Sequence, residues 1–127
     1  MPRQAITTDR APSAIGPYSQ ATRAGQSVFL SGQIPLVPET MQILEGDITA
    51  QSRRVFENLK AVCEAAGGSF ADVVRVGIYL TNLSDFAEVN AVMAEYFTAP
   101  FPARSTIEVS ALPKAARVEV DAIMVLA

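Results

Sequence analysis

Two charged residues near the C-terminal end have types and spacing that could act on a small carboxylate. Arg104 opens an alternating run, and Glu119 lies within a second, mostly apolar run from Arg117 to Ala127. An arginine can hold a carboxylate through two parallel N–H groups. A glutamate among apolar side chains favours its neutral form and can serve as a general acid or base. Together these roles suit a carboxylate whose neighbouring carbon is attacked by water, although a structural ion pair or two separate surface charges would account for the same residues equally well.

The composition excludes several other chemistries. The chain has no histidine and a single cysteine, Cys63, which falls beside the apolar stripe of a helix. Serine–histidine and cysteine–histidine catalysis are therefore excluded, and so are metal sites built on imidazole or thiolate. No phosphate-binding loop or dinucleotide fingerprint is present. We expect no metal, and chemistry by arginine, carboxylate, hydroxyls, backbone groups and water.

Length, charge and hydropathy set the broad class. The 127 residues suit a single domain, 1–127, and half of them are hydrophobic while only 18% are charged. This excess of apolar surface predicts a homo-oligomer. The net charge of -3 and the lack of a basic run argue against nucleic-acid binding. No apolar stretch is long enough for a membrane span, and the lone cysteine and the absence of a signal-peptide pattern favour a reducing cytoplasm.

The periodicity of apolar residues predicts the elements that position the two charges. Two strands within Ser19–Ile34 form a hairpin, a loop covers Leu36–Gly46, and a helix capped by Asp47 runs to a Gly67-Gly68 stop. A strand follows from Val73, with Val74, Val76, Ile78 and Leu80 on one face.

The second half of the chain continues the same alternation. Asp85 and Glu88 have the spacing of a capping box at the start of a second helix, and Pro100 and Pro102 end it. Two final strands then form a second hairpin, with its turn at Leu112–Lys114. The order β-β-α-β-α-β-β predicts an α+β fold in which two helices cover one face of a mixed sheet.

Three other positions have both a structural and a functional interpretation. Tyr18 follows Gly16-Pro17 in a turn-rich segment, where it either packs the loop onto the core or contributes to binding. Ser31-Gly32 interrupts a strand, which marks a bulge or a close approach of a ligand to the backbone. Asn90 lies beside the apolar stripe of the second helix, so its amide is either satisfied inside the core or directed into a pocket.

Four separated motifs span the chain. They are Pro102–Val109 (PARSTIEV) followed by Leu112–Pro113 and Val118–Val120, Ala14–Gln20 (AIGPYSQ), Ser31–Pro35 (SGQIP) and Asp85–Asn90 (DFAEVN). In order and spacing these motifs resemble the RidA (YjgF) family of reactive intermediate deaminases, and the resemblance covers essentially the whole chain.

The resemblance implies a fold like that of the small trimeric chorismate mutases. The family's three subunits pack sheet to sheet, with a cleft at each subunit interface. Its activity is the hydrolysis of 2-imino acids such as 2-iminobutanoate and 2-iminopropanoate to 2-keto acids and ammonia, with no cofactor. These imines and their enamine tautomers are released by pyridoxal-phosphate enzymes.

The resemblance also implies roles for specific residues. Arg104 matches the arginine that grips the substrate carboxylate, and Glu119 matches the carboxylate that positions water and assists proton transfer. Tyr18, Ser31, Gly32 and Asn90 match residues that line the cleft. Thr106 replaces a cysteine that many members carry two residues after the arginine, and Pro100–Pro102 belongs to a segment shorter than in some members, so substrate preference can differ.

The main alternative is a regulatory or chaperone-like trimer that binds small carboxylates without turnover. The presence of both Arg104 and Glu119 favours the enzyme, because binding alone requires only the arginine. An RNA nuclease has been claimed for some relatives, but the acidic balance and the missing histidine oppose it. A chorismate mutase would rest on fold analogy alone.

Overall fold

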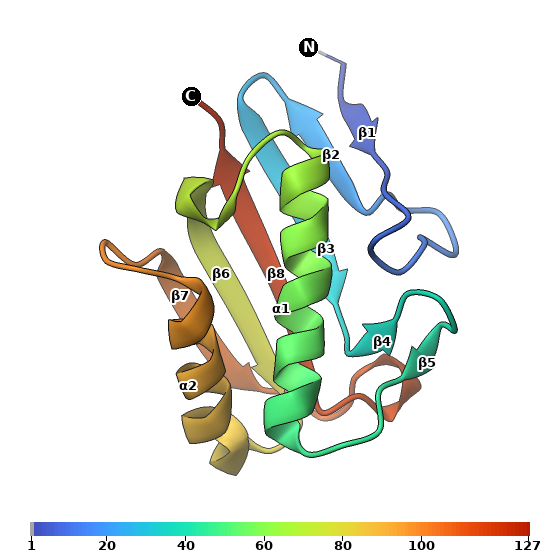
Figure 1. Ribbon diagram of the computed structural model, residues 1–127, viewed down its shortest axis with the longest axis vertical. Helices are drawn as coiled ribbons and strands as arrows, with labels where there is room; N and C mark the ends of the chain where they lie inside the picture. The colour runs from blue at the N-terminus through green and yellow to red at the C-terminus, as the bar shows by residue number, and fades with distance from the viewer. Residues whose placement is uncertain (1) are drawn as a thin grey trace.

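One mixed sheet and two helices form the framework of the molecule (Figure 1). The structure is a computed structural model that describes residues 2–127. The strands are β1 (Gln4–Ile6), β2 (Ala21–Ala24), β3 (Ser27–Gln33), β4 (Leu36–Val37), β5 (Gln42–Ile43), β6 (Val73–Leu80), β7 (Ala103–Glu108) and β8 (Val118–Val125). The helices are α1 (Ile48–Ala65) and α2 (Phe86–Tyr96), with short 3-10 turns at Phe70–Asp72, Leu83–Asp85 and Pro113–Ala115.

The strand order places the C-terminal strand in the middle of the sheet. The order is β1-β2-β3-β8-β6-β7, and every pair is antiparallel except β6 with β7. All seven predicted elements are present in the predicted order, and the α+β class is confirmed. Three short strands were not predicted: β1 pairs with β2, while β4 and β5 form a small hairpin in the segment expected to be a loop.

The predicted hairpin between the last two strands is wrong. β7 pairs in parallel with β6 at the edge of the sheet, and β8 lies on the other side of β6. The alternating pattern of a strand shows which residues share a face but not which strand lies beside it. The pattern therefore could not reveal that β6 lies between β7 and β8.

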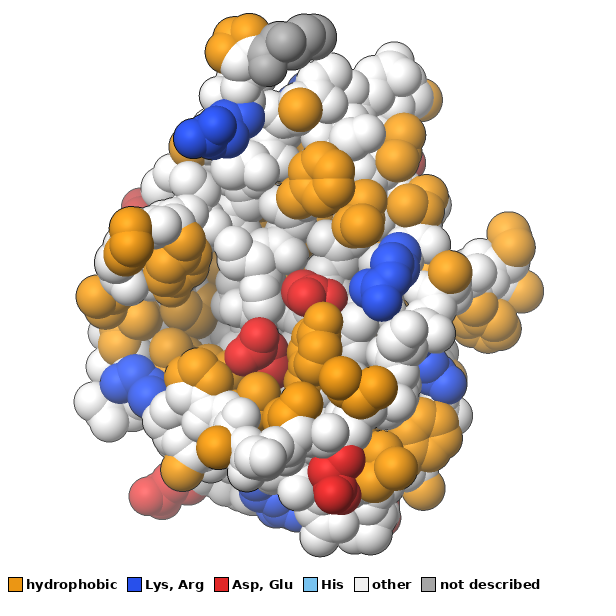
Figure 2. Space-filling model, turned by 180° about the vertical axis from the view of Figure 1, so that it is seen from behind, with side chains coloured by type: hydrophobic (Ala, Val, Ile, Leu, Met, Phe, Trp, Pro, Cys, Tyr) orange, Lys and Arg blue, Asp and Glu red, His pale blue; other side chains and the backbone are white. Residues whose placement is uncertain are grey.

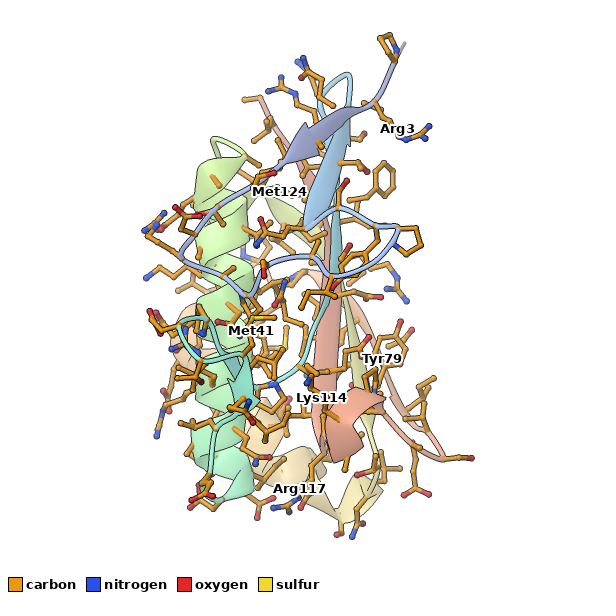
Figure 3. All side chains as sticks on the ribbon, turned by 90° about the vertical axis from the view of Figure 1, so that its right-hand side faces the viewer. Arg3, Met41, Tyr79, Lys114, Arg117 and Met124 are labelled. Carbon is orange, nitrogen blue, oxygen red and sulfur yellow. The ribbon has the colours of Figure 1, made fainter. Side chains whose placement is uncertain are left out.

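Both helices lie on the same face of the sheet, and the core is formed between the two layers (Figures 1 and 3). On α1, Val55, Leu59 and Val62 are fully buried against the apolar file of β8, which includes Val120 and Met124. Each such side chain contributes about 1.5–3 kcal/mol on burial. Within residues 2–127, no helix is both long and apolar enough to cross a membrane.

Helix α1 begins and ends as the sequence predicts, whereas α2 lacks its predicted side-chain cap. The Asp47 carboxylate accepts a hydrogen bond from the Ala50 N–H at 2.8 Å, and Gly67 adopts a positive φ of 92° just after the helix. The capping box at Asp85 is wrong, since Asp85 makes no side-chain cap bond. Both of its carboxylate oxygens instead accept hydrogen bonds from Arg117 at 3.1 Å.

A bulge at the start of β6 also corrects one expected core residue. The register between β6 and β8 shifts between Val73 and Arg75. As a result Val73 is buried, whereas Val74, expected on the core face, is 48% exposed. From Val76 onward the alternation agrees with the prediction, so Gly77 and Tyr79 alternate with the core residues. Figure 3 shows the Tyr79 side chain on the face away from the helices.

Candidate functional site

Arg104 lies on the helix side of the edge strand β7. It is in parallel register with Val76, whose side chain belongs to the core under the helices. The guanidinium Nη1 donates a hydrogen bond to the Asn90 Oδ1 at 2.6 Å and lies 3.7 Å from the Met93 sulfur. Its central carbon is 5.2 Å from the centre of the Phe86 ring. One face of α2 therefore holds the arginine through an amide, a thioether and an aromatic ring.

The Arg104 guanidinium has neutral neighbours and opens into a cavity. Within residues 2–127, its hydrogen bonds and ion pairs include no carboxylate partner. It lines a cavity of about 410 Å³ with Asn90, Met93, Ala94, Phe101 and Pro102. Because a guanidinium carries five N–H donors and this one uses only Nη1 on the protein, a two-pronged bond to an incoming carboxylate remains available.

Thr106 shares the face of Arg104 two residues further along β7. It is in register with Ile78, another core residue. Its hydroxyl oxygen is buried and has no hydrogen-bond partner among residues 2–127. A buried hydroxyl without a partner carries a free-energy cost.

Glu119 lies on the opposite face of the sheet. It is paired with Tyr79 in the register between β8 and β6, and its neighbours Val118 and Val120 point into the core. Figure 2 shows acidic side chains near the middle of this open face, with hydrophobic groups around them. Burial raises the pKa of the Glu119 carboxyl above its ordinary value, and the negative charge of Asp121 raises it further.

Gly32 gives the Glu119 carboxyl its position. The register between β3 and β8 shifts between Leu30 and Gln33, which confirms the bulge interpretation of Ser31-Gly32. A methyl group on Gly32 would lie 2.8 Å from the Glu119 Cδ and would overlap one of its oxygens. The glycine is needed because the carboxyl group of β8 rests directly on the backbone of β3.

Ser31 and Tyr18 extend the same open face. The Ser31 hydroxyl donates a hydrogen bond to the Ser19 carbonyl oxygen at 2.6 Å, which ties β3 to the N-terminal loop. Tyr18 is 54% exposed and lines, with Ser31 and Phe29, a broad hollow of about 720 Å³. The packing interpretation of Tyr18 is therefore the weaker one, since half of this side chain is free to contact a ligand or another chain.

The predicted residues thus form two groups rather than one. Arg104, Asn90 and Thr106 lie on the helix side at the β7 edge, whereas Glu119 and Gly32 lie on the open face. Strand β6 separates β7 from β8, and the sheet itself separates the two faces. Within one chain, Arg104 and Glu119 cannot contact the same small molecule.

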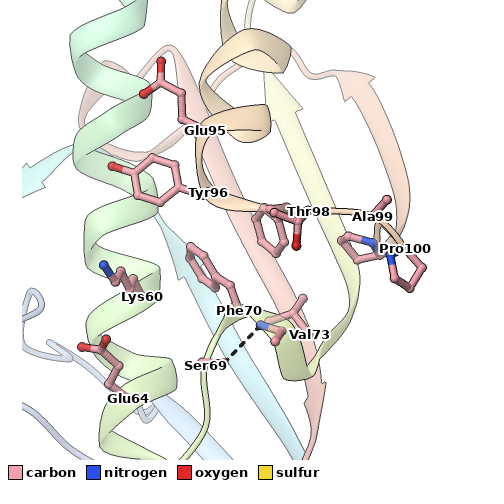
Figure 4. A pocket seen from close by; sticks show the side chains of 13 residues that line it. Lys60, Glu64, Ser69, Phe70, Val73, Glu95, Tyr96, Thr98, Ala99 and Pro100 are labelled. Carbon is pink, nitrogen blue, oxygen red and sulfur yellow. Dashed lines mark hydrogen bonds between the residues drawn. The ribbon is translucent and has the colours of Figure 1, made fainter.

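A further cavity contains none of the predicted catalytic or substrate-binding residues (Figure 4). It has a volume of about 600 Å³ and lies between α1 and the end of α2, beside the stacked rings of Phe70 and Phe97. Its polar groups include Lys60, Glu64 and Glu95, of which Glu64 and Glu95 pair with arginines. Nothing in it resembles the chemistry that the sequence predicts.

Cys63 is fully buried, and burial raises the pKa of its thiol to about 12, so it remains a neutral, unreactive thiol as expected. In the part of the chain from residue 2 to 127, histidine, cysteine, aspartate and glutamate form no cluster of three that could hold a metal ion.

Sequence reasoning missed Asp121 and the role of Phe86. In the sequence Asp121 alternates with the core residues of β8, and this pattern is typical of an ordinary surface charge. Phe86 was assigned to the apolar stripe of the second helix, but its ring also lies under the Arg104 guanidinium. The spacing of Phe86, Asn90 and Met93 on one helix face was the available signal.

Comparison with known proteins decides the family. A family model described as Endoribonuclease L-PSP matches residues 8–126. The chain belongs to the RidA (YjgF) family.

Members of the RidA family match over almost the whole chain. A protein named DfrA from Myxococcus xanthus is 58% identical, with 98% of this chain and 97% of the relative covered. The 2-iminobutanoate/2-iminopropanoate deaminase of Dermatophagoides farinae is 48% identical, with 98% of each covered. The structure of E. coli TdcF with bound serine is 42% identical and superposes with a TM-score of 0.93, covering 98% of this chain and 99% of that one.

Proposed function

We propose that this RidA-family protein hydrolyses small 2-imino acids, such as 2-iminobutanoate and 2-iminopropanoate, to 2-keto acids and ammonia. The observation that carries the proposal is the Arg104 guanidinium, which faces a cavity with neutral neighbours and free donors. The name of the 48% identical relative supports the same reaction, and the serine in TdcF is a small molecule with the required carboxylate.

We also propose that the active unit is a homotrimer with its clefts between copies. The open face exposes Phe29, Ile107 and Val125 by 40–49% each, which is the kind of surface that a second copy covers. Because Arg104 and Glu119 lie on opposite faces of one sheet, a site that uses both must take Arg104 from one copy and Glu119 from another. The division of the residues therefore supports a cleft at the interface.

In this site Arg104 binds the substrate carboxylate, and Asn90 and Phe86 fix the orientation of the guanidinium. Thr106, on the same face, offers its free hydroxyl to the substrate. Glu119 of the neighbouring copy, resting on Gly32, positions the water and exchanges protons with it and with the departing nitrogen. Tyr18 and Ser31 form the wall on that side.

No cofactor is required in this proposal, because the carbon of an iminium group is already electrophilic. Orienting the substrate and the water accounts for much of the rate enhancement. We further propose that the enzyme works in the reducing cytoplasm, since its only cysteine is a buried free thiol. Such an enzyme would remove imines that pyridoxal-phosphate enzymes release.

Release of ammonia or keto acid from freshly generated 2-iminobutanoate tests the proposal. We expect the wild type to accelerate release above spontaneous hydrolysis and Arg104→Ala to lose the acceleration while it remains folded. No acceleration by a folded wild-type protein that binds the keto-acid product would contradict the enzyme and favour the carboxylate-binding trimer.

A further inference from the structure

Two acids on the open face of β8 each rest on a glycine of a neighbouring strand. Glu119 lies against Gly32 of β3, and Asp121 lies against Gly77 of β6, with which it is in register. A methyl group on either glycine would overlap the carboxylate that faces it. Both carboxyl groups are therefore held close to the sheet rather than extended into solvent, and both are only partly exposed.

Asp121 is held by Tyr79 of β6 and lies near Arg75 of the same strand. The Tyr79 hydroxyl donates a hydrogen bond to the Asp121 Oδ2 at 3.0 Å. A methyl group on Gly77 would lie 2.9 Å from the Tyr79 oxygen and 3.2 Å from the Arg75 Nη1, so both side chains converge on this position with Asp121. Burial and the hydrogen bond to Asp121 raise the pKa of the Tyr79 hydroxyl, which therefore keeps its proton as the donor.

Asp121 and Glu119 lie on the same face of β8, with Asp121 against Gly77 of β6 and Glu119 against Gly32 of β3. Residues two apart on a strand share a face at a spacing of about 7 Å, so the two carboxyl groups interact through a partly buried surface. The other titratable groups on this face include Tyr79 and Arg75 of β6, and Tyr18 and Arg3 at the hollow beside β3. Arg117, just before β8, pairs with Asp85, and the facing segment of β3, Ser31–Gln33, has no titratable side chain.

We propose that Asp121 is a positioning residue whose charge disfavours ionisation of Glu119, so that the protonated form of Glu119 can act as the acid that begins the reaction. This inference rests on the proposed imine hydrolysis. Tyr79 and Gly77 hold Asp121 where it can act, and Gly32 holds Glu119.

The proton transfers then balance over one turnover. Glu119 gives its proton to the imine nitrogen, which forms the iminium ion and leaves a carboxylate. Water adds to the iminium carbon, and the Glu119 carboxylate takes the proton released by the water. Glu119 next protonates the amino nitrogen, the C–N bond breaks and ammonia leaves. The protonated carbonyl that remains returns its proton to Glu119, which restores the starting state.

Carbon-13 NMR titration of the glutamate carboxyl groups tests the proposal without relying on activity. The Glu119 signal is assigned by its loss in Glu119→Gln, and its midpoint is compared in the wild type and Asp121→Asn. Asparagine removes the charge but can still accept the hydrogen bond from Tyr79, so we expect the midpoint to move to lower pH. Glu39→Gln, a change on an exposed turn, is the matched control and should leave the midpoint unchanged.

An unchanged Glu119 midpoint in Asp121→Asn would overturn the proposal. If that variant does not fold, Tyr79→Phe carries the test, because it frees Asp121 to move away and should also lower the midpoint. Asp121→Glu restores the charge and should return the midpoint toward that of the wild type.

The pH profile of kcat/KM connects this result to the reaction. If the protonated Glu119 is required, activity falls as pH rises through its midpoint, and in Asp121→Asn this fall should begin at lower pH. A midpoint that moves while the profile does not would overturn the role of Glu119 as the starting acid. A protein that shows the NMR shift but does not hydrolyse imines would instead refute the proposed function and leave the coupling of the two carboxyl groups in place.

Discussion

The β7 edge and the open face of β8 differ in the surroundings of their charged residues. At the edge, Arg104 is exposed and has only neutral neighbours, Asn90, Met93 and Phe86. On the open face, Glu119 is partly buried and close to a second acid, Asp121. The Arg104 guanidinium is therefore free to bind an anion, whereas burial and the charge of Asp121 favour the protonated form of the Glu119 carboxyl group. The difference supports the proposed division, with binding in one region and proton transfer in the other.

The largest expected effect comes from Glu119→Gln. Because glutamine cannot exchange protons, kcat should fall about 10²–10⁴-fold, the usual contribution of a general acid–base group. Binding of the keto-acid product should persist, since Arg104 is untouched. Steady-state kinetics and calorimetric titration measure the two quantities, and an unchanged kcat would remove Glu119 from the chemistry.

Arg104→Lys tests the binding region. An ammonium group cannot reproduce the two-pronged bond, so kcat/KM should fall about 10–100-fold, the equivalent of one or two lost charge-assisted hydrogen bonds. Arg53→Lys, on the exposed side of α1, is the matched control, and its kinetics should equal those of the wild type. Near-normal kinetics for Arg104→Lys would contradict the carboxylate clamp.

Thr106→Val separates a ligand contact from a structural one. The Thr106 hydroxyl has no partner in the free protein, so its removal should not lower the free energy of unfolding. If the hydroxyl binds the substrate, KM should rise about fivefold, the equivalent of one ordinary hydrogen bond. A loss of stability with unchanged KM would show that the hydroxyl serves the fold and not the site.

The smallest expected effect is the pH dependence of stability. The pKa of Glu119 is raised in the folded state, so the folded protein holds this proton to higher pH than the unfolded chain does. Stability should therefore fall as pH rises from the ordinary glutamate pKa through the folded one. Glu119→Gln should remove this part of the fall, as measured by urea unfolding at fixed protein concentration from pH 4 to 8. Parallel curves for the two proteins would contradict the raised pKa.

Local patterns in the sequence predicted the elements, whereas long-range pairing decided the site. Helix α1 was predicted from its Asp47 cap to its Gly67 stop because all of those signals lie within the segment itself. Asp85 had the signal of a cap, but Arg117, 32 residues away, takes its carboxylate. Sequence spacing cannot show such a competitor.

The same limit explains why the two regions of the site were expected to lie in one hairpin. The alternation in β7 and β8 was correct, but β6 lies between them. Arg104 could not be assigned to the helix side because an edge strand has few buried residues to mark its faces. Asp121 was missed because its importance depends on Gly77 and Tyr79 of another strand.

Complementation between two inactive variants tests the central claim most directly, namely that each site joins the Arg104 region of one copy to the Glu119 region of another. Arg104→Ala and Glu119→Gln chains are mixed in equal amounts, unfolded and refolded together. If each site draws on two copies, random assembly leaves both residues intact in about a quarter of the sites, and about a quarter of wild-type activity should return. Activity no greater than the average of the two variants measured separately would contradict the shared site.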